Sequence, residues 1–134
     1  MRLLLDTHIA LWAITDSPRL NAQARSLILD PVNSIHISTA SVWEIAIKHM
    51  LGRGGMPISG TQAAVHFQAA GFTELPVVNA HIAILETLPP HHTDPFDRLL
   101  VAQALAEPLR LLTHDASVSR YSDSIILEIG RAHV

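Results

Sequence analysis

The chain has 134 residues and no cysteine, so it is long enough to bury one ordinary core, and disulfides and thiolate metal sites are excluded. Its composition, 49% hydrophobic and 16% charged, excludes a disordered chain. The formal net charge of -3, with one lysine and eight arginines, argues against holding nucleic acid by bulk charge. An acidic enzyme can still act on nucleic acid where metal ions neutralise its carboxylates.

The N-terminal segment MRLLLDTHIALWAI is apolar and could suggest a signal peptide. Asp6 and His8 interrupt it, and no small-residue cleavage site follows, so we interpret it as the first strand and helix of a domain. No apolar run approaches the roughly 20 residues of a membrane span. We therefore expect a cytoplasmic protein that does not bind a membrane.

In the first half of the chain, apolar spacing predicts two strands and three helices. In chain order these are a strand at residues 2–5, helices at 8–14 and 21–29, a strand at 34–38 and a helix at 41–51. The helix at 41–51 is apolar around most of its circumference, so we expect it to be largely buried.

The second half continues the alternation of strands and helices. In chain order we expect a helix at 61–70, a strand at 73–78, helices at 80–88 and 95–107, and strands at 110–113 and 124–127. Pro76 places its strand near an edge or an end of the sheet. The order predicts one α/β domain over residues 1–128, with a mainly parallel sheet of four to five strands. Right-handed crossovers should place helices on both of its faces.

Acidic residues recur where these elements meet. Asp6 and Asp115 each follow an apolar strand, and functional groups of open α/β sheets gather at the carboxyl ends of strands. Asp94 and Asp97 open the helix at 95–107. Each acid also has a purely structural interpretation, because aspartate is a favoured helix N-cap and an acid in the first turn complements the helix dipole. When each acid is considered alone, helix capping is the preferred interpretation for Asp6, Asp94 and Asp115. For Asp97, a structural role and a role in a functional site remain equally open.

Glu44 lies inside the apolar helix at 41–51, with Lys48 four residues further on. An exposed ion pair with Lys48 is the ordinary explanation and stabilises a helix by roughly 0.2–0.5 kcal/mol. Acids are almost never buried unless they are paired, and a metal ion would be a stronger reason for a glutamate on such a helix.

Considered together, four acids are the candidates for one catalytic, metal-binding site: Asp6, Glu44, Asp97 and Asp115. Carboxylates that converge repel one another unless a cation lies among them. Oxygen ligands suit Mg²⁺ or Mn²⁺, and such ions activate water for phosphodiester cleavage. This convergence is inferred from topology, since the residues are far apart in the chain.

Nine histidines raise the alternative of a zinc site. His91 and His92 precede Asp94, but the sequence has neither an HExxH motif nor a cysteine, so zinc has weak support. His8 and His114 lie beside two of the acids and are candidates for hydrogen bonding to metal ligands.

Four blocks, LLLDTHIALW, SVWEIAIK, DPFDRLLVAQAL and LLTHD, together resemble the PIN domain family, and more narrowly the VapC-type toxins of bacterial toxin–antitoxin pairs. The resemblance runs from Met1 to about Leu127, with the blocks in the family's order. It implies a three-layer α/β/α sandwich and a Mg²⁺- or Mn²⁺-dependent endoribonuclease. It also implies an RNA substrate, a homodimer and a small antitoxin that docks over the active site.

By motif match, Asp6 resembles the family's first-strand acid, Glu44 its helix glutamate and Asp97 the acid before the LLVAQA run. Asp115 matches a fourth, more variable acid. The resemblance also implies supporting roles in orienting ligands or holding RNA or a carboxylate, for these residues: Asp94, Thr7, Thr113, Arg98 and Lys48.

The chain ends in IGRAHV, which a common short-read sequencing adapter encodes when it is followed by a stop codon. We therefore expect residues 129–134 to be a non-native tail in which Arg131 and His133 have no function. The nucleotide sequence tests this, because other codons there would contradict it.

Other functions fit the sequence less well. An aspartyl-phosphate phosphatase would need a D-x-D pair, whereas Thr7 and His8 follow Asp6. A PIN-like nuclease outside toxin–antitoxin systems, or a catalytically silent PIN-like binding module, remains an alternative. The presence of all four acids favours an enzyme.

Overall fold

The strand β1 (Arg2–Leu5) forms the centre of the protein, because its three leucines are completely buried. Successive side chains of a strand point to opposite faces of a sheet. Leu3 and Leu5 accordingly pack into one hydrophobic core, and Leu4 packs into a second core on the other face. A strand that is buried on both faces is typical of a parallel sheet covered by helices on both sides.

The computed structural model describes residues 1–128, so the proposed non-native tail (129–134) lies outside the described residues. Five strands pair in the order β3-β2-β1-β4-β5, and every pairing is parallel. The other four strands are β2 (Ser34–Ser38), β3 (Thr73–Leu75), β4 (Arg110–Thr113) and β5 (Ile126–Leu127). The predicted parallel sheet of an α/β/α sandwich is confirmed.

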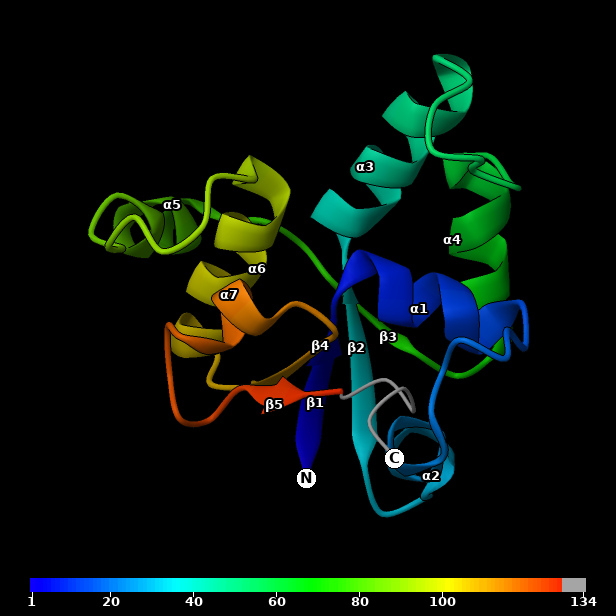
Figure 1. The fold of residues 1–134 in the computed structure, drawn as a ribbon, viewed down its shortest axis with the longest axis horizontal. Coiled ribbons are helices and arrows are strands. Elements are labelled where there is room, and N and C mark those ends of the chain that lie inside the picture. Colours follow the sequence, from blue (N-terminus) through cyan, green and yellow to red (C-terminus); the bar gives the residue numbers. More distant parts are fainter. Residues whose placement is uncertain (129–134) are drawn as a thin grey trace.

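Helices cover both faces of this sheet (Figure 1). On one side lie α1 (Thr7–Ile14), α2 (Ala22–Leu29) and α4 (Gly60–Ala69), and on the other lie α5 (Asn79–Leu85) and α6 (Pro95–Ala106). The remaining helices are α3 (Thr39–Met50), which follows β2 directly, and the single turn α7 (Ala116–Ser119). Within residues 1–128, no helix has the length and apolar character needed to cross a membrane.

Three expectations about the elements need correction. The strand predicted at 73–78 ends at Leu75, because Pro76 has no N–H for the ladder, and β3 is an edge strand as expected. The strand predicted at 124–127 is shorter, since β5 spans only Ile126–Leu127. The helix predicted to be largely buried is α3, yet Trp43 is 60% exposed and Met50 76% exposed. Figure 1 shows the reason, which is that α3 projects beyond the end of β2.

One glycine sets the closest approach between α3 and α4. A Cβ added at Gly60 would lie 2.7 Å from the Ala46 Cβ and 3.0 Å from the Val42 carbonyl oxygen. Neither atom is the end of a flexible side chain, so the two helices would have to separate.

We expect Gly60→Ala to lower the free energy of unfolding by about 1–3 kcal/mol through this overpacking. The measurement is urea denaturation of wild type and variant. Thr61→Ala, at the exposed neighbouring position of α4, is the matched control and should have little effect. Equal midpoints for Gly60→Ala and the control would contradict the close helix approach.

Candidate active site

Asp6 joins the end of β1 to the start of α1 and is 4% exposed. Its Oδ1 accepts the Ile9 backbone N–H at 2.8 Å, so it is the N-cap of α1. Its Oδ2 accepts a hydrogen bond from Thr113 Oγ1 at 2.6 Å and from the His114 backbone N–H at 3.2 Å. The cap and the site interpretations are therefore compatible, because each uses a different oxygen.

Glu44 lies in α3 and is 3% exposed. Thr7 Oγ1 donates to Glu44 Oε1 at 2.7 Å, and Lys48 Nζ lies 2.6 Å from Glu44 Oε2. The ordinary i, i+4 pair is thus present, but the Glu44 end of it is buried while the Lys48 side chain is 33% exposed. Two donors therefore hold this carboxylate at the carboxyl end of the sheet.

Asp94 and Asp97 divide the start of α6 between them. Asp94 Oδ1 accepts the backbone N–H groups of Phe96 at 2.8 Å and Asp97 at 3.1 Å, with Pro95 in the first turn. This cap fixes the position of Asp97, whose Oδ2 lies 2.8 Å from His92 Nε2. Asp94 therefore supports the site by placing Asp97.

Asp115 follows β4 and caps α7. Its Oδ1 accepts the backbone N–H of Ser117 at 2.8 Å and the Ser117 hydroxyl at 2.7 Å. Its Oδ2 lies 3.7 Å from His92 Nε2. As with Asp6, one oxygen caps a helix and the other faces the site.

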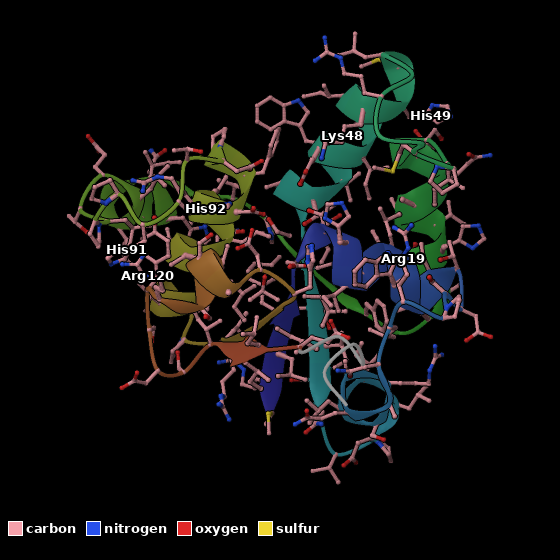
Figure 2. The ribbon with its side chains drawn as sticks, viewed as in Figure 1. Arg19, Lys48, His49, His91, His92 and Arg120 are labelled. Atoms are coloured by element: carbon pink, nitrogen blue, oxygen red, sulfur yellow. The ribbon has the colours of Figure 1, made fainter. Side chains whose placement is uncertain are left out.

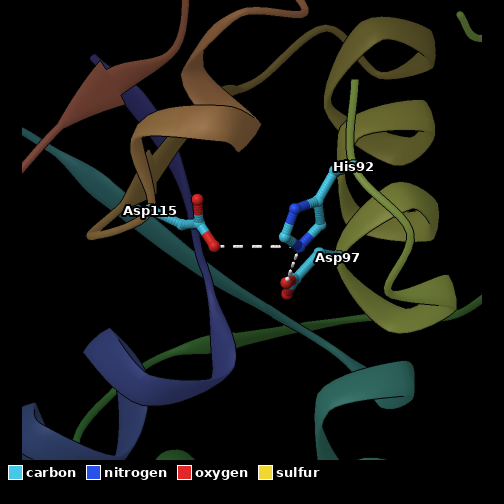
Figure 3. Close-up of side chains that lie close together, drawn as sticks. All are labelled: His92, Asp97 and Asp115. Carbon is cyan, nitrogen blue, oxygen red and sulfur yellow. Dashed lines mark hydrogen bonds and ion pairs between the residues drawn. The ribbon is translucent and has the colours of Figure 1, made fainter. Parts of the chain in front are cut away.

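His92 thus lies between two of the predicted acids (Figure 3). One ligand atom from each of His92, Asp97 and Asp115 can be chosen so that all three lie within 4.8 Å of one another. Across residues 1–128, this is the only group of three or more such residues. The structure therefore brings Asp97 and Asp115 together through a histidine, while Asp6 and Glu44 lie outside that group.

The acids are nevertheless close enough for the charge of one to change the pKa of another. Burial, opposed by the hydrogen bond to His92, raises the pKa of Asp97 to about 6, and repulsion from Asp94, Asp6 and Glu44 adds to the increase. Carboxylates that raise one another's pKa are a fitting environment for a cation. The carboxylate oxygens fit a hard divalent ion such as Mg²⁺ or Mn²⁺, whereas the imidazole nitrogen of His92 favours a transition metal.

Asp115 differs from Asp97 in its ionisation. Partial burial acts to raise the pKa of Asp115, but the two hydrogen bonds from Ser117 outweigh it, so the pKa lies below its ordinary value. Asp115 is therefore an ionised carboxylate at neutral pH.

A second histidine contacts Asp6. His114 Nδ1 lies 3.2 Å from Asp6 Oδ2, and this interaction raises the pKa of His114. The His114 ring packs between His8 and Trp12, with ring centroids 5.0 Å and 5.2 Å away. Burial lowers the pKa of His8. Both histidines that the sequence placed beside acids therefore line the site, and His114 contacts an acid directly.

Arg98 has a different environment from the one that the sequence suggested. Its guanidinium donates to the Pro89 carbonyl at 3.0 Å and to the Tyr121 hydroxyl at 2.9 Å, with longer contacts at 3.4 Å to the carbonyls of Leu88 and His92. Tyr121 in turn accepts the His92 backbone N–H at 3.0 Å. Arg98 therefore fixes the loop that carries His92, and Lys48 is the cation that holds a carboxylate.

The sequence considered His92 only as a weak zinc ligand and did not single out Ser117. Figure 2 labels His92 in the loop before α6 and Lys48 on α3. The only local signal for His92 was its place five residues before Asp97, in the loop that leads into α6. Ser117 had no signal, because its role depends on contact with His92 across 25 residues of chain.

The parallel sheet, with carboxylates gathered near the carboxyl ends of its central strands, defines an α/β domain with an acidic candidate site. The sequence model of the PIN domain family matches residues 3–124. The chain belongs to the PIN domain family. No curated protein matches it.

Several solved structures share the fold. VapBC2 from Rickettsia felis, bound to a DNA fragment from its promoter, matches with a TM-score of 0.64 at 19% identity, covering 96% of this chain and 98% of that chain. A toxin–antitoxin complex from Klebsiella pneumoniae matches with a TM-score of 0.65 at 17% identity and the same coverages. VapBC-1 from nontypeable Haemophilus influenzae matches with 0.64 at 19% identity, covering 95% and 96%. At these identities the likeness shows the fold.

The raised pKa of Asp97 predicts a pH-dependent cost to stability. An acid whose pKa is higher in the folded state contributes stability below its unfolded pKa of 3.8, and that contribution is lost as the pH rises through about 6. In the presence of EDTA at pH 8, Asp97→Asn should therefore be more stable than wild type, by on the order of 2 kcal/mol. Urea denaturation measures the difference, which should disappear below pH 4. If the variant is no more stable than wild type at pH 8, ionised Asp97 does not destabilise the fold and the prediction is wrong.

Proposed function

We propose that this protein is a Mg²⁺- or Mn²⁺-dependent endoribonuclease that hydrolyses RNA phosphodiester bonds. One observation carries the proposal, which is that buried or half-buried carboxylates from separate segments meet at the carboxyl ends of β1 and β4. Such burial of like charges is unfavourable without a cation. The PIN domain family consists generally of nucleases that use divalent metals, which supports the same function.

In this proposal, Asp97 and Asp115 hold the ion, with Asp6 and Glu44 contributing to the same field. The bound ion would lower the pKa of a water molecule and stabilise charge on the phosphate oxygens. Thr113 holds Asp6 through a hydroxyl hydrogen bond. The chain thus fixes its carboxylates before any ligand arrives, and preorganised groups stabilise a transition state without further rearrangement.

Glu44 and Lys48 have complementary roles in this site. Thr7 and Lys48 hold the Glu44 carboxylate in place through both of its oxygens. The Lys48 ammonium is partly exposed, so it can also attract an RNA phosphate. Because the chain carries a net charge of -3, such local attraction must replace a basic surface.

We further propose that the enzyme is the toxin of a toxin–antitoxin pair, in the cytoplasm of a bacterium, as a homodimer with a small antitoxin over the site. The sequence resemblance to VapC-type toxins supports this. So do the solved structures that share the fold, one of which is described as a toxin–antitoxin complex and two as VapBC proteins. A nuclease role outside such pairs is the alternative.

The direct test is Mg²⁺- or Mn²⁺-dependent cleavage of a total-RNA pool. Asp97→Asn should lower the cleavage rate at least about 100-fold, since even outer partners of metal ligands account for roughly 10–100-fold. EDTA should abolish wild-type cleavage. The stability expected of this variant separates lost chemistry from lost folding.

Asp123→Asn is the matched control, because Asp123 is an exposed aspartate outside the site. It should retain wild-type activity. Full activity of Asp97→Asn, or cleavage that persists in EDTA, would refute the proposed function. A protein that cleaves no RNA would support the catalytically silent binding module instead.

A further inference from the structure

Hydrogen bonds to the backbone of His92 fix the position of this residue. Its N–H donates to the Tyr121 hydroxyl at 3.0 Å, and its carbonyl accepts from Arg98 at 3.4 Å. Its side chain is 18% exposed and points between Asp97 and Asp115 (Figure 3). The imidazole ring is therefore placed in the acidic site by contacts that are independent of the acids.

Ser117 determines which ring nitrogen of His92 carries a proton. Its Oγ lies 2.7 Å from Asp115 Oδ1 and 2.7 Å from His92 Nδ1. A hydroxyl has one proton to donate, and Ser117 donates it to Asp115 Oδ1. Ser117 therefore donates to Asp115 and accepts from His92, so His92 Nδ1 carries a hydrogen.

With a hydrogen on Nδ1, the neutral ring has its lone pair on Nε2. That nitrogen lies 2.8 Å from Asp97 Oδ2 and 3.7 Å from Asp115 Oδ2. Three electron-rich atoms this close require a proton or a cation among them. Two donors on one ion, each about 2.1 Å from it, are about 3.0 Å apart at right angles and about 4.2 Å apart when opposite, so these separations suit a shared divalent ion.

We infer that His92 Nε2 is a direct ligand of the divalent ion, together with carboxylate oxygens of Asp97 and Asp115. This inference rests on the proposed function, because it names a further ligand for the same ion. Ser117 then has the role of fixing the ring tautomer, as partners of metal-bound histidines commonly do. Because imidazole suits transition metals better than Mg²⁺, the site should bind Mn²⁺ more tightly than Mg²⁺.

The test is pulsed electron paramagnetic resonance after Mn²⁺ is added to the protein from which all metal has been removed. Wild type should show coupling between the Mn²⁺ electron spins and an imidazole nitrogen. His92→Gln should lose that coupling, and its Mn²⁺ affinity measured by calorimetry should fall at least about tenfold. A histidine that only orients Asp97 by a hydrogen bond would give no direct nitrogen coupling in wild type.

Two matched controls sharpen the result. His91→Gln alters the adjacent histidine, whose ring packs on Tyr121, and should leave the coupling unchanged. His114→Gln alters the histidine beside Asp6 and should also leave it unchanged. Coupling that survives in His92→Gln and disappears in His114→Gln would overturn the inference.

The outcomes separate this inference from the proposed function. Mn²⁺ that binds without nitrogen coupling would overturn the ligand role of His92 and leave an all-oxygen metal site intact. Failure to bind Mn²⁺ at all would overturn both.

Discussion

The burial of carboxylates at one edge of the sheet is the constraint on which the rest of the site depends. Asp6 and Glu44 are 4% and 3% exposed, and charges so deeply buried must be paired or hydrogen bonded. The fold meets this requirement with Thr113 of another segment for Asp6, and with Thr7 of α1 and Lys48 of the same helix for Glu44. Thr113 ends the strand that leads to Asp115, and Thr7 follows Asp6 at the start of α1, so fold and site are specified together.

Most of the sheet could be predicted because its signals are local. The buried leucines of β1 mark a strand covered on both faces, and Pro76 marks the end of an edge strand. Sequence patterns gave the wrong prediction where burial depends on which other elements lie nearby. The apolar surface of α3 predicted burial, yet Trp43 is exposed because the helix extends beyond the sheet. The Trp43 ring contacts an aromatic neighbour, Phe96. A pattern of apolar residues shows which surface of a helix could be buried. Whether that surface is buried depends on another element packing against it.

The sequence could nominate the acids, because Asp6 and Asp115 follow strands whose ends converge by topology, but it could not show how the side chains are grouped. Helix capping and metal binding were alternatives for Asp6 and Asp115, and in the structure each carboxylate caps a helix with one oxygen and directs the other at a side chain of another segment. His92 enters the group because Arg98 and Tyr121 hold its loop, which is a set of contacts between distant segments. No spacing in the sequence encodes such contacts.

We propose above all that this edge of the sheet holds a divalent ion. Anomalous diffraction from crystals grown with Mn²⁺ tests it most directly. The account predicts a peak bonded to Asp97 and Asp115, with Asp6 and Glu44 facing the same space. A well-ordered site without a Mn²⁺ peak, or an ion bound elsewhere on the protein only, would contradict the account.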